Sequence, residues 1–186
     1  FGQSLSDIGH LLRKHLSPPS NLKATFKVVR NHLAGMSKGV TRDEPFAREL
    51  INLLFCKIYD ELNTDLDKPV RLFAGDEAPG LTKGRLERLF SDVRQAYDDV
   101  FDHNDVIELD AKSVTYIVGQ LQHLLITEAD TDAVGDAFET FIGPALKGSL
   151  GQFFTPRNVV RMMVEIIDPE PGQHLIDPAC GSGGFL

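Results

Sequence analysis

The stretch His174-Leu-Ile-Asp-Pro-Ala-Cys-Gly-Ser-Gly-Gly-Phe-Leu186 decides how the C-terminal part of the chain is expected to fold. It begins with a short apolar run that ends in the carboxylate of Asp177, and three glycines follow within residues 181–184. Glycine lets the backbone turn tightly and lets a ligand lie against it without interference from a Cβ atom. We therefore predict a strand over residues 174–177 that runs into a ligand-binding glycine loop, as at the start of an open α/β cofactor domain.

The glycine spacing excludes two phosphate-binding loops. A P-loop needs a lysine directly after its last glycine, and none follows here; a dinucleotide loop starting at Gly181 would need glycine where Leu186 stands. A carboxylate at the strand end would repel pyrophosphate but attract a cationic ligand. S-adenosylmethionine carries an ammonium and a sulfonium, so Asp177 and the loop favour this methyl donor. The alternative is a plain strand-to-helix turn in which Asp177 is a cap.

A helix is expected directly before this strand. Thr155 is suited to be its N-cap and Pro156 its first residue. Apolar residues from Val159 to Ile167 continue the helix to Asp168-Pro169, and a turn at 171–172 follows. Helix, turn, strand and glycine loop then succeed one another, and the neighbouring strands that such a loop requires do not follow within the 186 residues. We therefore expect the sequence to be part of a longer protein.

The first 145 residues are predicted to be helical. Thr41 to Glu44 resemble a capping box with Pro45 just inside the helix start, and prolines and glycines over residues 64–81 indicate a loop. Apolar residues recur at helical spacing and are expected to form a core. These stripes are Leu22, Phe26, Val29 and Leu33; Phe46, Leu50, Leu53, Leu54, Ile58 and Leu62; Leu86, Leu89, Phe90, Val93 and Tyr97; Val114, Ile117, Val118, Leu121 and Leu125; and Val134, Ala137, Phe138 and Phe141.

Charge is distributed unevenly along the chain. The formal net charge is −8, yet residues 1–42 hold seven Lys and Arg against the single acid Asp7. This basic stretch is either a solvated helix surface or a contact for phosphates or a partner subunit. The candidate contact residues are Arg13, Lys14, Lys23, Lys27 and Arg30.

The composition is that of a globular protein of the cytoplasm. Two cysteines without a CxxC pair argue against a disulfide framework and against zinc, and they favour a reducing compartment. No apolar run approaches the roughly 20 residues of a membrane helix, so we expect no membrane partner.

Two motifs together carry a family resemblance. Gly151-Gln-Phe-Phe-Thr-Pro156 followed by Asp177-Pro-Ala-Cys-Gly-Ser-Gly-Gly-Phe-Leu186 resembles the N6-adenine DNA methyltransferases, most closely the modification subunit of type I restriction-modification systems. The resemblance is dense over residues 148–186. The preceding helices, with Leu53 to Glu61, are similar in kind to that subunit's N-terminal domain. The family resemblance implies a mainly α fold. It implies an N-terminal helical bundle over residues 1–145, followed over 146–186 by the truncated start of an α/β, Rossmann-like methyltransferase domain.

The resemblance also implies the cofactor, S-adenosyl-L-methionine, and its site. Thr155 and nearby amides would meet the carboxylate of the cofactor's methionine part, Asp177 would lie near its ammonium, and one of Phe153 and Phe154 would line the pocket. Cys180 is expected to be a small buried residue rather than a nucleophile, because no His or acid is placed to activate it. The cofactor-binding residues implied are Gln152, Phe153, Phe154, Thr155, Pro156, Asp177, Ala179, Cys180, Gly181, Ser182 and Gly183.

The family's catalytic motif, Asn/Asp-Pro-Pro-aromatic, is absent from these residues, since Pro18-Pro19 is followed by Ser20. The resemblance therefore implies that the parent protein methylates a flipped adenine while these 186 residues alone are inactive. The implied partners are DNA and a specificity subunit, with a restriction subunit as a further candidate. Alternatives are a methyltransferase acting on RNA or protein, or a helical module that binds a specificity subunit or DNA. Leu186 and the Thr-Pro helix start disfavour a nicotinamide-dependent oxidoreductase.

Overall fold

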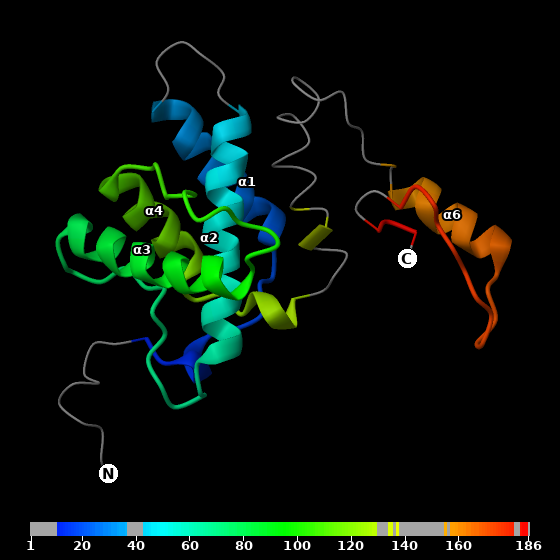
Figure 1. Ribbon diagram of the computed structural model, residues 1–186, viewed down its shortest axis with the longest axis horizontal. Helices are drawn as coiled ribbons and strands as arrows, with labels where there is room; N and C mark the ends of the chain where they lie inside the picture. The colour runs from blue at the N-terminus through cyan, green and yellow to red at the C-terminus, as the bar shows by residue number, and fades with distance from the viewer. Residues whose placement is uncertain are drawn as a thin grey trace. The chain divides into compact units, whose positions relative to one another are not determined.

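The computed structural model describes residues 11–36, 43–129, 134–135, 137, 155, 157–180 and 183–185 (Figure 1). The chain divides into two compact units, Phe1–Ala145 and Leu146–Leu186. Its described parts are mainly helical, as predicted, and contain no strand. Nor do they contain a helix that is both long and apolar enough to span a membrane. The elements are η2 (Arg13–His15), α1 (Leu22–Met36), α2 (Asp43–Asn63), α3 (Pro79–Ala96), α4 (Ala111–Leu121), η3 (Ile126–Glu128) and α6 (Arg157–Ile167).

Helix α1 buries the stripe that its sequence predicts. Leu22, Phe26, Val29 and Leu33 are all buried, because residues three and four apart lie on one side of a helix. The side chain of Asn21 caps the helix by accepting the Ala24 N–H at 2.9 Å. Near the other end of α1, the His32 ring stacks on Tyr116 of α4, with ring centroids 3.8 Å apart. The apolar side of α1 therefore faces the core, and its opposite side is left to solvent.

Helix α2 runs through the middle of the first unit, and α3 packs against it (Figure 1). Leu50, Leu53 and Leu54 are buried as predicted. The prediction is wrong for Leu62, which is 60% exposed at the end of the helix. The expected single apolar stripe was too simple for a central helix, since the other sides of α2 are covered as well, and they carry Lys57 and Glu61 into the interior.

The buried charges of α2 form a network with the end of the first unit. The Lys57 ammonium lies 3.4 Å from Glu61 Oε1 and donates to the carbonyl of Gln122 at 3.3 Å. The two Glu61 oxygens accept the N–H groups of Ile126 at 3.0 Å and Thr127 at 2.8 Å. Burial lowers the pKa of Lys57, while the carboxylate of Glu61 opposes that shift. The pair thus holds the segment after α4 against α2.

Residues 64–78 are irregular but firmly attached. Asp60 of α2 accepts the backbone N–H groups of Arg71 at 2.7 Å and Leu72 at 2.8 Å. The Arg85 guanidinium donates to the Arg71 carbonyl at 2.9 Å and lies 3.7 Å from the centre of the Phe73 ring. The predicted loop over 64–81 ends earlier than expected, because Pro79 is accepted as the first helical residue of α3 and the helix begins there.

The next two apolar stripes are confirmed. In α3 the side chains of Leu86, Leu89, Phe90 and Val93 are buried, and in α4 those of Val114, Ile117, Val118 and Leu121 are buried. Of the last predicted stripe, Val134 and Ala137 are described and Ala137 is buried, whereas Phe138, Phe141 and the predicted capping residue Thr41 lie outside the described residues.

Asp110 caps α4 and provides a test of the local structure. One of its carboxylate oxygens accepts the N–H groups of Lys112 at 2.9 Å and Ser113 at 3.1 Å, and the other accepts the Ser113 hydroxyl at 2.6 Å. We expect Asp110→Ala to lower the free energy of unfolding by about 1 kcal/mol at pH 7, measured by chemical denaturation. Asp99→Ala, at an exposed acid outside the helices, is the matched control and is expected to change little.

The effect of Asp110→Ala also depends on pH. The hydrogen bonds from Ser113 hold the pKa of Asp110 below its ordinary value. The stabilisation by ionised Asp110 is therefore fully present above the pKa that this carboxyl has in the unfolded chain. It is lost as the pH falls through the lower pKa that the carboxyl has in the folded chain. We expect the difference between wild type and variant to shrink on acidification. A difference that stays constant down to pH 2 would contradict ionised capping.

Candidate functional site

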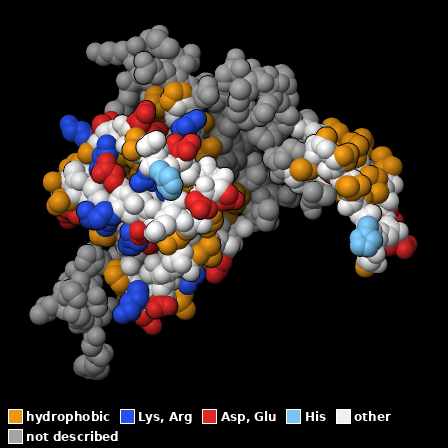
Figure 2. Space-filling view, in the orientation of Figure 1, with side chains coloured by type: hydrophobic (Ala, Val, Ile, Leu, Met, Phe, Trp, Pro, Cys, Tyr) orange, Lys and Arg blue, Asp and Glu red, His pale blue; other side chains and the backbone are white. Residues whose placement is uncertain are grey.

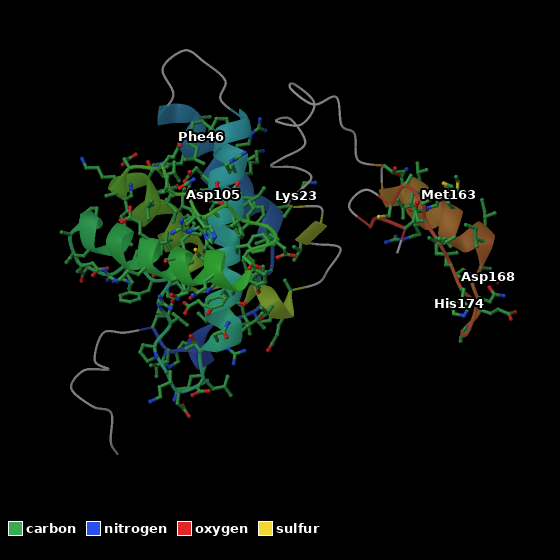
Figure 3. The ribbon with its side chains drawn as sticks, in the orientation of Figure 1. Lys23, Phe46, Asp105, Met163, Asp168 and His174 are labelled. Atoms are coloured by element: carbon green, nitrogen blue, oxygen red, sulfur yellow. The ribbon has the colours of Figure 1, made fainter. Side chains whose placement is uncertain are left out.

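Helix α6 and the turn after it form the framework of the predicted cofactor site. The helix ends at Ile167, and the next residue, Asp168, has φ +46°, the left-handed conformation that terminates helices, before Pro169. Gly172, at φ +93°, then allows a turn in which the Gln173 N–H donates to the Glu170 carbonyl at 3.1 Å. Figure 3 shows Asp168 and His174 at the same end of α6, so the chain turns back there.

The chain returns along α6 to its first turns. A Cβ atom on Gly184 would lie 4.0 Å from Cγ2 of Val160, and the Val160 side chain is buried. The glycine loop therefore lies against the N-terminal part of α6, close in sequence to Thr155. Val160 supports the loop in a way that the sequence did not indicate. The only signal in the sequence was that Val160 is apolar, and this was interpreted only as part of the apolar side of the helix.

The predicted strand over residues 174–177 is not present among the described residues. Leu175 is 51% exposed and Ile176 is 86% exposed. An extended segment becomes a strand only when a neighbouring strand pairs with its N–H and C=O groups, and the described residues supply no such neighbour. The segment is nevertheless continuous with the loop that the sequence predicts.

Among the described residues of the loop, local hydrogen bonds form before residues 181–182 and across them. Asp177 Oδ1 accepts the Ala179 N–H at 2.9 Å, and the Gly183 N–H donates to the Cys180 carbonyl at 2.8 Å. Gly183 has φ +76°, a conformation that a side chain disfavours, and a Cβ atom added there would meet nothing within 4 Å. The backbone at Gly183 thus borders open space where a ligand can approach closely.

The predicted cofactor residues are only partly visible. Thr155, Ala179 and Cys180 are exposed, and Asp177 and Gly183 are partly buried. The expected burial of Cys180 is wrong, because no described side chain covers it. Gln152, Phe153, Phe154, Pro156, Gly181 and Ser182 lie outside the described residues.

A hydrophobic surface accompanies the loop in the second unit. Figure 2 shows hydrophobic side chains gathered over α6, and Met163 extends from the helix in Figure 3. Such a continuous exposed apolar area in a water-soluble protein is ordinarily covered by further structure. Its exposed members are Met162, Met163, Ile166, Ile167, Leu175 and Ile176.

Known proteins are similar in sequence to the part of the chain that holds α6 and the loop. Residues 129–186 match the family described as N-6 DNA Methylase, and this range contains α6 and the whole loop. Over residues 129–186, the chain is similar to the N-6 DNA methylase family. The predicted family resemblance is therefore confirmed.

Individual relatives extend the likeness into the helical unit. The methylase subunit of the type I restriction enzyme StySPI from Salmonella potsdam is 26% identical over 156 residues, which cover 76% of this chain and 30% of that protein. The EcoEI methylase subunit from Escherichia coli is 32% identical over 96 residues, 50% of this chain and 19% of that protein. A 156-residue match is longer than the second unit, so the sequence similarity to the StySPI subunit extends into the first unit.

A shorter segment of the chain is similar to a third methylase subunit. The MjaVII methylase subunit from Methanocaldococcus jannaschii is 41% identical over 63 residues, which cover 32% of this chain and 11% of that protein. The chain thus spans less than a third of the length of each of these relatives.

Proposed function

We propose that the longer protein containing this chain is the methylase subunit of a type I restriction-modification system, which transfers a methyl group from S-adenosylmethionine to the N6 atom of adenine in DNA. The observation that carries the proposal is the glycine loop lying against the first turns of α6. A Cβ atom on Gly184 would lie 4.0 Å from Val160, so the glycine motif lies beside the helix that follows the Gln152 to Pro156 motif in sequence. Related proteins named type I restriction enzyme methylase subunits support the same function.

The described residues fit S-adenosylmethionine. One oxygen of Asp177 is engaged by the Ala179 N–H, and the carboxylate as a whole remains a negative charge beside the loop that favours the cofactor's ammonium. The open space beside Gly183 lets the cofactor approach the backbone. Thr155 and the N–H groups at the start of α6 suit the cofactor's carboxylate. When bound, S-adenosylmethionine supplies an electrophilic methyl group, which these residues would hold in a fixed position.

We further propose that residues 146–186 begin a Rossmann-like α/β domain and that residues 1–145 form a separate helical domain. The exposed apolar surface of α6 and residues 174–177 supports this division, because the neighbouring strands and helices of an α/β domain would cover it. The same covering strands would pair with residues 174–177 and complete the predicted strand.

DNA and a specificity subunit are the proposed partners, and a restriction subunit is a further one. The relatives' names, all of type I restriction enzymes, support these partners. Methylation of RNA or protein is the remaining alternative.

The proposed function is tested by mixing the full-length protein and its specificity subunit with labelled S-adenosylmethionine and duplex DNA, RNA or protein. We expect label in DNA, recovered as N6-methyladenine after digestion. A protein of only these 186 residues is expected to transfer nothing, since it lacks an Asn-Pro-Pro-aromatic motif. Label confined to RNA or protein would overturn the proposal.

A further inference from the structure

Helix α1 presents a cationic side to solvent. Lys23 and Lys27 are exposed and stand four residues apart, so they lie on the same side of the helix. Arg30, one turn further on, is partly buried on that side. The helix contains no Asp or Glu, although the whole chain has a formal net charge of −8. In Figure 3, Lys23 lies at the edge of the helical unit.

Other basic residues near the N-terminus are engaged within the chain. Lys14 forms an ion pair with Asp67 at 2.7 Å, and Arg13 is partly buried. Arg30 already has an interaction within the chain. Within the part of the chain that the structure describes, Lys23 and Lys27 take part in no ion pair. Two exposed side chains of the predicted basic set are therefore available to an external anion.

The opposite side of α1 fixes these two lysines in place. Leu22, Phe26 and Val29 are buried in the core, and the His32 ring is stacked on Tyr116 of α4. The helix therefore cannot roll without breaking its packing. Four residues rise about 6 Å along a helix, which corresponds to about two phosphate steps of a DNA strand at 3.4 Å each.

We propose that the exposed side of α1, through Lys23 and Lys27, binds the phosphate backbone of duplex DNA. The inference rests on the proposed function, in which DNA is the substrate, and it adds a contact remote in sequence from the glycine loop. The proposal is supported by charge complementarity. A helix surface with lysines and without acids attracts a polyanion such as DNA. Phosphate contacts position a protein on DNA without reading its sequence.

The test uses the full-length protein with its specificity subunit and measures DNA affinity between 50 and 200 mM salt. Each phosphate contact contributes about 0.9 to the slope of log affinity against log salt concentration. We expect the double variant Lys23→Gln, Lys27→Gln to lower that slope by about 1.8. Over this fourfold salt range, wild type should therefore lose about 12-fold more affinity than the variant loses. The effect should be equal for DNA with and without a recognition site.

The matched control is Lys68→Gln with Arg88→Gln, which removes two exposed charges outside α1. The control should keep the wild-type slope. The inference would be overturned if the Lys23 and Lys27 variant had the wild-type slope of log affinity against log salt concentration. It would also be overturned if the variant lost the specificity subunit while that slope stayed unchanged. Methyl transfer to DNA is measured on the same samples, so a failure of the proposed function would appear separately as an inactive wild-type assembly.

Discussion

Replacing Asp177 by Asn in the full-length protein is expected to weaken the binding of S-adenosylmethionine by about 10- to 100-fold. Asn can still accept the Ala179 N–H through its side-chain oxygen, so the turn that starts the loop is kept. Only the negative charge that we propose to face the cofactor's ammonium is removed. A hydrogen bond to a charged group contributes about 1.5–3 kcal/mol, which corresponds to this range of dissociation constants. Titration calorimetry with the full-length protein measures the change.

Asp168→Asn is the matched control for Asp177→Asn. It removes the same charge from the same unit, at an exposed residue whose φ of +46° asparagine tolerates. We expect cofactor binding by this variant to equal that of wild type. Equal weakening in both variants would show a general charge effect, and unchanged binding in Asp177→Asn would remove Asp177 from the site.

Replacing Glu61 by Ala is expected to destabilise the chain by about 3–5 kcal/mol. The change leaves the buried ammonium of Lys57 without its counter-charge and leaves the Ile126 and Thr127 N–H groups without acceptors. Loss of one partner from a buried ion pair is costly because the remaining charge stays desolvated. Chemical denaturation followed by circular dichroism measures the free energy of unfolding.

Glu87→Ala provides the comparison for Glu61→Ala. Glu87 also pairs with a lysine four residues away, Lys83 at 3.6 Å, but its side chain is about half exposed. An exposed pair of this kind contributes about 0.3–0.5 kcal/mol. Similar small losses in both variants would mean that the Lys57 and Glu61 pair is solvated in solution.

Local patterns predicted the helices well. The stripe of α1 is correct because residues such as Phe26 and Val29 meet the core whatever the rest of the chain does. The start of α3 was placed too late, since proline and glycine at 79–80 were interpreted as loop residues when proline also suits a first helical turn. Leu62 was predicted to be in the core because helical spacing shows on which side of a helix a residue lies. It does not show whether other elements cover that side at the end of the helix.

Features that depend on distant contacts could not be predicted in the same way. The burial of Lys57 and Glu61 follows from α2 being enclosed by segments more than 60 residues away in sequence. At the candidate site, the sequence indicated the loop and its acid. It did not indicate that Val160 would support Gly184, because that contact requires the turn through Gly172. The predicted strand over residues 174–177 needs a neighbouring strand to pair with, and the described residues supply none.

The contacts made by Lys57 and Glu61 also bear on how the first unit folds. They join residues 65 positions apart, from Glu61 to Ile126 and from Lys57 to Gln122. Closing so long a loop costs more entropy than pairing neighbouring helices, so these contacts should form after the rate-limiting step. Losing them would then accelerate unfolding while leaving the folding rate nearly unchanged, and the native lifetime of this unit would depend on one buried carboxylate.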